Sequence, residues 1–269
     1  MPHGMSWFHF LPGFDNLQEY IRQAGGRSWI QHSLVGIQHV IAAGLVLVVL
    51  MLLSFNARRQ LAAAKDGGVV PSPRFSALNF VELISQALYG QLQTLCGADA
   101  RRFFPVIGSL ALFIFFSNVL GLIPGFSPPT DNLNTTFACG LFVFIYYNYH
   151  GLRVNGLGHI THMANPVGEW WGWFLAPLMF PIELISHLAR PLSLSLRLLG
   201  NMVGDHAVLG AFVGIFPFLI PLPFFVLGFV VCIVQTVVFC LLSMVYLSLA
   251  VAHSDHGDEH GHGDAKAHA

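Results

Sequence analysis

The sequence predicts an all-α membrane protein, and three observations lead to that prediction. Of its 269 residues, 55% are hydrophobic and only 9% are charged, whereas about a quarter of the residues of a soluble domain are charged. Apolar runs long enough to cross about 30 Å of hydrocarbon recur along the chain. One apolar run, 183–206, holds two arginines far from any polar flank. We expect five membrane passes, a long tilted C-terminal helix hairpin and an amphipathic surface helix.

The first part of the chain is expected to form an interfacial segment, one span and one surface helix. Residues 1–33 mix aromatic and polar groups, which suits an outer or interfacial N-terminal segment without a cleavable signal. The first span is predicted at about 34–55, and a Gly- and Pro-containing linker at 60–74. Residues 75–95 place Leu and Val among Asn, Glu, Ser and Gln, so they predict an amphipathic helix on the inner surface.

The middle of the chain predicts two further spans. These are 105–123 and about 134–149, separated by a turn at 124–131. A loop containing His150 is expected to follow the second of them. The three tryptophans of 170–173 are typical of a membrane interface.

Two long helices are predicted to end the transmembrane domain, which we place at 34–252. The first is expected to start after Pro177 or Pro181, because proline interrupts a helix. A Pro-rich turn at 217–223 precedes the second, at 224–252. Residues 253–269 are predicted to form a His-rich cytoplasmic tail.

The distribution of basic residues predicts the orientation, because Lys and Arg near span ends stay on the cytoplasmic side. One set of connecting segments holds eight of the 12 basic residues: Arg58, Arg59, Lys65, Arg74, Arg101, Arg102, Arg153 and Lys266. The opposite set holds only Arg22 and Arg27. We therefore expect the N-terminus outside and the C-terminus in the cytoplasm.

A polar stripe runs along the helix that contains both buried arginines. Ser193, Arg197, Asn201 and Asp205 follow one another at intervals of four and so share one helix face. An arginine at mid-bilayer costs roughly 2.5–3.5 kcal/mol, whereas each Leu returns about half a kcal/mol. Arg197 has no carboxylate three or four residues away. Its default interpretation is functional, and an internal salt bridge to Asp205 or Glu183 is the structural alternative.

The stretch Arg190-Pro-Leu-Ser-Leu-Ser-Leu-Arg-Leu-Leu-Gly-Asn-Met202 resembles the signature of subunit a of F-type ATP synthases. Other elements agree in order: the Pro129–Thr136 segment, Glu183 ahead of the arginine, and Gln235 followed by Tyr246–Ala250. The resemblance covers roughly 75–252.

The resemblance implies ion translocation, of protons in the first place, through two half-channels beside a rotor ring. Flow through them would drive rotation and ATP synthesis. The chain itself would be non-catalytic, which agrees with the lack of a phosphate-cradling loop in its sequence. The implied partners are the ring of c subunits, whose mid-membrane carboxylate would face Arg197, the b-type subunits of the peripheral stalk and the other ATP synthase subunits. The implied location is the lipid bilayer of a bacterial inner membrane, and no nucleic acid is expected.

The same resemblance assigns roles to single residues. Arg197 would be the gate between the half-channels, because a guanidinium stays charged and favours the ionised form of a facing carboxylate. The family's outer pathway has a titratable pair, one member on each helix. His206 occupies the first position, and the second falls near Gly228, so Asp205 is a candidate to supply the missing carboxylate.

Other positions on the ion path carry a second interpretation. Gln235 is expected on the facing helix at the depth of the stripe. Glu183 resembles the inner-path carboxylate, although an interfacial contact with His187 would also explain it. Ser193 and Asn201 belong to the path by their register with Arg197, or they only satisfy backbone or water. Arg190 is expected to extend to the membrane surface.

No cofactor or metal is expected. The four cysteines show no CxxC spacing, and the tail histidines lack the spacing of a closed metal site. Two alternatives of other classes stay open at this point. His32 and His39, seven residues apart, would suit a haem-binding anchor subunit. A self-contained secondary transporter is the other, although no internal repeat is visible.

Overall fold

The computed structural model describes residues 16, 19–20, 38–63, 77–123, 125–156, 172–215 and 221–252. The described part is helical and contains no strand. Its six α-helices are α2 (Gln38–Ala63), α3 (Ala77–Cys96), α4 (Ala100–Leu122), α5 (Leu133–Asn155), α7 (Gly172–Ile215) and α8 (Pro221–Ala252). Two short turns, η2 (Gly97–Asp99) and η3 (Pro129–Asp131), precede α4 and α5. Nearly all of the predicted N-terminal segment, the tryptophan-rich stretch and the tail lie outside the described residues.

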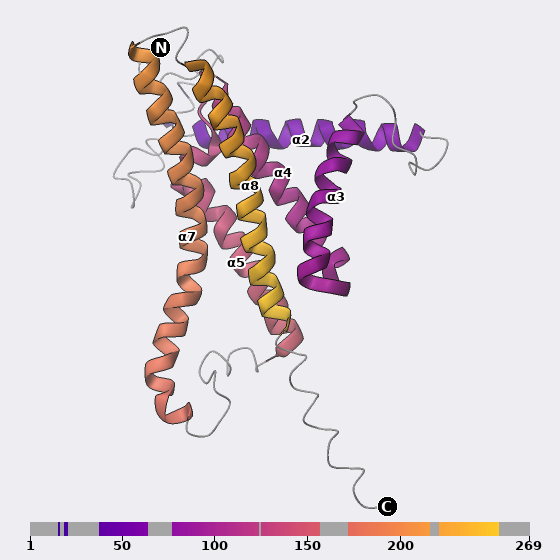
Figure 1. Cartoon of the computed structure of the whole chain (residues 1–269), viewed down its shortest axis with the longest axis vertical. Coiled ribbons are helices and arrows are strands. Elements are labelled where there is room, and N and C mark those ends of the chain that lie inside the picture. The colour runs from indigo at the N-terminus through magenta and orange to yellow at the C-terminus, as the bar shows by residue number, and fades with distance from the viewer. Residues whose placement is uncertain are drawn as a thin grey trace, which may run out of the picture.

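The helices form one bundle in which α7 and α8 are the longest members. Figure 1 shows α7 and α8 side by side and running in opposite directions, with α4 and α5 packed behind them. The helix α2 runs crosswise to α7 and α8 (Figure 1). The largest fully buried side chains of the core come from five of the helices and include Phe103, Tyr147, Leu198 and Phe239. A continuous apolar core therefore fixes α7 against its neighbours.

Among the described helices, three are long and apolar enough to cross a membrane: Gln38–Ala63, Ala100–Leu122 and Leu222–Val251. The chain is thus a membrane protein by composition and length of its helices. The two other predicted passes, α5 and α7, are not among these three helices. The helix α7 contains two arginines and two carboxylates, which makes it more polar.

The helix α3 has the amphipathic character expected from its sequence. Its Leu92 is fully buried, and Leu88, Tyr89 and Leu95 pack against the core cluster. Its Leu83 is 65% exposed on the opposite side. The Ser248 hydroxyl of α8 donates a hydrogen bond to the carbonyl of Leu95 (2.8 Å), which ties the end of α3 to the bundle.

Two helix boundaries differ from the prediction. The helix α5 continues to Asn155, so His150 lies in a helix and not in a loop. Gly151 only weakens a helix, and Arg153 in the last turn interacts favourably with the helix dipole. The helix α7 begins at Gly172, ahead of both Pro177 and Pro181. Each proline removes a single backbone donor, which a long helix in an apolar environment tolerates.

The close packing of α5 on α7 depends on a glycine. A Cβ atom added at Gly140 would lie 2.8 Å from the carbonyl oxygen of Pro191. The Ser195 hydroxyl donates a hydrogen bond to the same carbonyl oxygen (2.6 Å). The contact fixes the rotation of α7 about its own axis, and with it the direction of the polar stripe.

Candidate functional site

The polar stripe of α7 lies beside a buried apolar seam. Leu194, Leu198 and Met202 are 2%, 1% and 4% exposed and hold the helix in the bundle. Ser193, Arg197 and Asn201, each one residue earlier, are exposed. Successive helical residues point about 100° apart, so the stripe faces outward at the edge of the contact.

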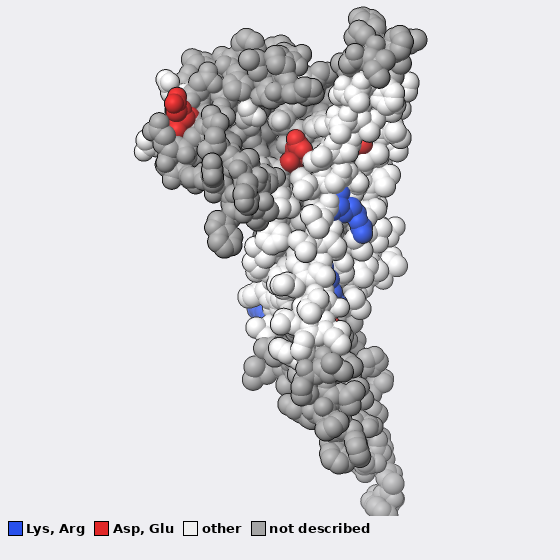
Figure 2. Space-filling view, turned by 90° about the vertical axis from the view of Figure 1, so that its left-hand side faces the viewer, with Lys and Arg blue, Asp and Glu red and all other residues white. Residues whose placement is uncertain are grey.

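The side of the molecule on which α7 lies carries few charged side chains (Figure 2), and two glycines follow Arg197 on this helix. Figure 2 looks onto the side where α7 lies and shows a mainly uncharged surface with isolated basic and acidic side chains. A Cβ atom added at Gly200 or Gly204 would meet nothing within 4 Å. Among the described residues, no carboxylate forms an ion pair with Arg197. The guanidinium is thus presented on an open face of α7.

Asn201 and Gln235 join the stripe to α8. The Asn201 side-chain amide donates a hydrogen bond to the Gln235 side-chain oxygen over 2.6 Å. Gln235 is only 4% exposed, and its own amide nitrogen has no partner in the described part of the chain. An unsatisfied buried amide costs about 1–3 kcal/mol. A void of about 10 Å³ beside it, also lined by Asn118 and Asp205, is close to the size of one water molecule.

His206 lies at the far end of the stripe between α4 and η3. Its Nε2 atom is 2.9 Å from the Gly121 carbonyl oxygen. A carbonyl only accepts, so Nε2 carries the hydrogen and donates it. The Nδ1 atom then has a free lone pair in the neutral ring, and it lies 3.9 Å from an Asp131 carboxylate oxygen. A proton arriving at Nδ1 would be held between the ring and that carboxylate.

Asp131 is held in place by neighbouring helices. The Thr130 hydroxyl donates to the side-chain oxygen of Asn118 in α4 (2.9 Å), and both residues are buried. Asn132 accepts from the backbone of Asn134 and so caps α5 (2.9 Å). Its side-chain nitrogen is 3.5 Å from Nδ1 of His39 in α2. The turn η3 is thereby anchored to three helices.

The structure places Asp131 beside His206, and Asp205 also interacts with His206 electrostatically. Sequence reasoning assigned no site role to Asp131, although the segment containing it was among the resembling elements. Gly228 lies near the same place, and a Cβ atom added there would meet a Leu122 side chain at 2.7 Å. Asp205, His206 and Gly228 line a cavity of about 90 Å³. The position in α8 where a titratable partner of His206 was expected is thus occupied by Gly228, and this cavity lies beside it.

A second polar cluster lies toward the start of α7. His187 is 8% exposed, and its Nε2 is 3.4 Å from a Glu183 carboxylate oxygen. The Tyr147 hydroxyl of α5 is 3.4 Å from Nδ1 of the same ring. In the neutral ring, Nε2–H donates to Glu183 while Nδ1 accepts from Tyr147. The sequence showed the Glu183–His187 spacing but gave no sign of Tyr147.

Arg190, expected from the sequence to extend to the membrane surface, contacts an aromatic ring of α8. It is half-buried, and its guanidinium carbon lies 5.3 Å from the ring centroid of Tyr246 in α8. A cation over an aromatic face gains about 0.5–2 kcal/mol. This contact holds the Arg190 guanidinium against α8.

The candidate haem ligand His39 lies beside the cap of α5, and three cysteines lie in the apolar core. His39, one of the two candidate haem ligands, contacts Asn132, and His32 lies outside the described residues. Three cysteines, Cys139, Cys232 and Cys240, are buried thiols. Within the described ranges, no three His, Cys, Asp or Glu residues gather in a metal-binding arrangement.

Comparison with known proteins adds a strong similarity. The family model described as "ATP synthase A chain" matches residues 39–248. A protein of Sorangium cellulosum named ATP synthase subunit a is 41% identical over 250 residues, 91% of this chain and 94% of that protein. Proteins of the same name from Bdellovibrio bacteriovorus and Geobacter sulfurreducens are 42% and 43% identical, over 81% and 78% of this chain and 93% and 86% of theirs.

Proposed function

The chain belongs to the ATP synthase A chain family, and from this premise we propose that it conducts protons through two half-channels beside the rotor ring. Membership implies proton translocation in the membrane part of an ATP synthase, together with other subunits of that complex. The finer proposal concerns the two half-channels, the coupling of flow to rotation, and the residues that line the path.

One observation carries the proposal: Arg197 is exposed on a face of α7 where no described carboxylate pairs with it. A charge inside the membrane is costly unless a partner compensates it. We assign that compensation to the mid-membrane carboxylate of a c subunit. The open surface at Gly200 and Gly204 supports this assignment, because it allows a helix of the ring to pass closely.

The outer half-channel is assigned to the His206 end of the stripe. A proton from outside would bind the free Nδ1 of His206 next to Asp131. It would then move along Asp205, Asn201 and Gln235, which border the water-sized void, to the carboxylate of the rotor. Asn201 and Gln235 have no titratable group, so their role is to orient water.

The inner half-channel is assigned to the other end of α7. A rotor carboxylate that has completed its circuit would release its proton toward Glu183 and His187, which contact each other and Tyr147. Ser193 lies between this cluster and Arg197 on the exposed face. Its hydroxyl donates to the Arg190 carbonyl (3.0 Å), which leaves its lone pairs free for water.

Arg197 would separate the two paths electrostatically. A guanidinium is protonated at any working pH, so it does not relay protons itself. It stabilises the ionised rotor carboxylate opposite it, and the low dielectric of the membrane strengthens that attraction. A carboxylate would thus lose its proton before passing Arg197, and protons could not move directly from one half-channel to the other.

Helix length supports steep tilting of the α7–α8 hairpin. At 1.5 Å per residue, the 44 residues of α7 span about 66 Å and the 32 of α8 about 48 Å. Both exceed the hydrocarbon thickness of about 30 Å. Since α2 runs crosswise to both (Figure 1), an upright α2 leaves them inclined toward the membrane plane. We propose five passes on this basis, with α3 on the inner surface.

The remaining parts of the proposal follow from the family. The b-type stalk subunits would hold this chain against rotation with the ring, and ATP chemistry would occur on other subunits of the complex. The location would be the inner membrane of a bacterium, with the C-terminus in the cytoplasm. The family assignment favours this function over a self-contained transporter and over a haem-binding anchor.

The orientation can be tested at the two ends of α4. In a chain without its native cysteines, we expect Asp99→Cys to react with a membrane-impermeant thiol reagent only from the cytoplasmic side. Ile123→Cys should react only from outside. Asp99 and Ile123 are both exposed, so each thiol is accessible in the fold. The reverse labelling in sealed right-side-out and inverted vesicles would contradict the assigned half-channels.

The outer path can be tested by its access to water. In the same background, cysteines at Asp131, Asp205 and His206 should react with Ag⁺ in the assembled enzyme, measured as loss of thiol labelling, because Ag⁺ reacts with thiolates in an aqueous path. Val234→Cys, exposed on the lipid-facing side of α8, and the buried Leu198→Cys are the controls and should react far less. Uniform inertness of the three path positions would refute the aqueous stripe.

A further inference from the structure

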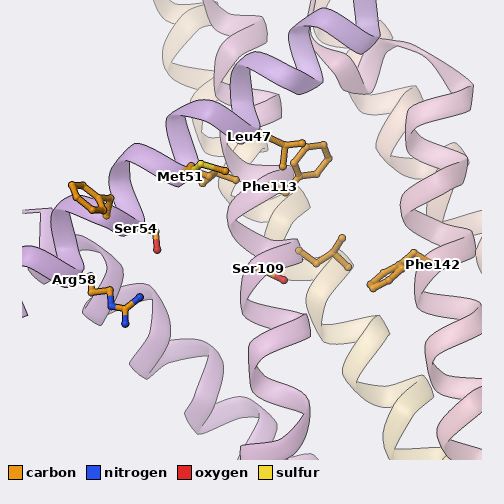
Figure 3. A pocket seen from close by; sticks show the side chains of 10 residues that line it. Leu47, Met51, Ser54, Arg58, Ser109, Phe113 and Phe142 are labelled. Carbon is orange, nitrogen blue, oxygen red and sulfur yellow. The ribbon is translucent and has the colours of Figure 1, made fainter.

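A cavity of about 570 Å³ lies between α2, α4 and α5, away from the proposed ion path. Figure 3 shows Leu47, Met51, Ser54 and Arg58 along α2, with Ser109 and Phe113 on α4 across from them. Phe142 of α5 closes a further side. The volume lies in the usual range of ligand pockets, about 300–1,000 Å³. No residue assigned to the two half-channels lines this cavity.

The lining changes from apolar to polar along α2. Leu47, Met51, Ser54 and Arg58 are three or four residues apart and therefore share one face of the helix. Ser109 does not add polarity at the apolar end, because its hydroxyl donates to the Val106 carbonyl (3.0 Å). The cavity thus has an apolar body, one free hydroxyl and a cationic end.

No described residue compensates the charge at the cationic end. None of the ten lining residues is acidic. Within the described helices and turns, Arg58 is exposed and has no ion pair. Its neighbour Arg59 lies over the Phe55 ring at 5.8 Å and does not line the cavity. The position therefore suits an anionic group at Arg58.

The depth of Arg58 matches the edge of the hydrocarbon layer. It lies 20 residues after Gln38, at the beginning of α2, which corresponds to about 30 Å of helix. This distance equals the hydrocarbon thickness of a typical bilayer. The apolar body of the cavity is then at the depth of lipid chains, and Arg58 at the depth of phosphates.

We propose that this cavity binds an anionic phospholipid. The phosphate would accept hydrogen bonds from the Arg58 guanidinium, and a glycerol or ester oxygen would meet the Ser54 hydroxyl. An acyl chain would lie over Leu47, Met51 and Phe113. The bound lipid would fill the gap between α2 and the helices α4 and α5, and so link α2 to the rest of the bundle. We assign this lipid to the inner leaflet, and that assignment rests on the orientation proposed above.

A lipid fits these observations better than a helix from another subunit. A membrane helix seated here would have to place a carboxylate opposite Arg58 and cover the apolar body as well. A phospholipid has this order of groups in every molecule, and anionic lipids concentrate on the cytoplasmic leaflet.

Photo-crosslinking of the whole complex tests the proposal. The ATP synthase would be reconstituted in phosphatidylcholine vesicles that contain either phosphatidylglycerol or phosphatidylcholine with a photoreactive acyl chain. Crosslinked peptides of α2 and α4 would be quantified by mass spectrometry. We expect the phosphatidylglycerol probe to label Leu47, Met51 or Phe113 more strongly than the phosphatidylcholine probe. Arg58→Gln should reduce this labelling about fivefold, the factor expected for one basic residue near an anionic lipid.

Two variants serve as matched controls. Arg59→Gln removes the neighbouring charge outside the cavity and should leave the labelling unchanged, and Arg58→Lys should retain most of it. Equal labelling by both probes in the unmodified complex would overturn the proposal, whether or not Arg58→Gln assembles. An equal loss in Arg59→Gln, or crosslinking of Met51 to another subunit in place of lipid, would overturn it as well. None of these results depends on proton flow, so they are separable from a failure of the proposed function.

Discussion

Replacement of Arg197 by alanine should reduce ATP-driven proton pumping to background while the complex still assembles. The guanidinium has no described carboxylate partner within this chain, so its removal strands no buried charge. Arg197 is also exposed and contributes little to the core, which Leu194 and Leu198 form on the adjoining face. Without the cation, the ionised form of the rotor carboxylate is no longer stabilised between the two half-channels. A protonated carboxylate could then pass directly from one to the other, so passive proton leak should rise.

The measurement is proton flux in inverted vesicles containing the assembled enzyme, with and without ATP. Arg153→Ala, which removes an exposed arginine at the end of α5, is the control and should pump normally. Arg197→Lys should fail as well, because a shorter ammonium loses the planar fork and can release its proton when desolvated. Near-normal pumping by Arg197→Ala would end the gate hypothesis. Loss of the subunit from the membrane would indicate a structural ion pair in its place.

The sequence predicted the fold class, the order of the helices and the polar stripe, because each depends on local periodicity. Apolar runs and the spacing of Arg197 and Asn201 can be read without knowledge of tertiary contacts. The starting point of α7 could not be predicted in this way. Proline predicts a break from local propensity, whereas the environment of a long apolar helix overrides that propensity at Pro177 and Pro181.

The residues that contact the stripe from other helices and turns were less predictable than the stripe itself. Asp131 reaches His206 only because η3 is anchored to α2 and α4 by Asn132 and Thr130, and these contacts join segments far apart in the sequence. Tyr147 reaches His187 only through the packing of α5 on α7. A local pattern does not contain such contacts. The one available signal for Asp131 was its place in a polar segment ahead of an apolar run.

His206 and Asp131 should behave as a single functional unit in proton uptake from outside. His206→Ala removes the Nδ1 atom that would receive the proton, and Asp131→Asn removes the charge that stabilises the protonated ring. Positioned proton-transfer groups contribute about 10²–10⁴-fold to a rate. Because water in the path can replace part of that, we expect each single change to lower ATP synthesis by at least about tenfold.

A double-mutant cycle distinguishes this unit from two independent contributions. The combined variant His206→Ala/Asp131→Asn should be scarcely slower than either single variant, because the partner of each residue is already lost. Asp205→Asn, the alternative carboxylate, should have the smaller effect, since it has no contact with His206 comparable to that of Asp131. The measurement is ATP synthesis driven by an imposed proton gradient in vesicles with equal amounts of assembled enzyme. Fully multiplicative losses for His206 and Asp131, or a larger loss from Asp205→Asn, would show that the outer path does not depend on this pair.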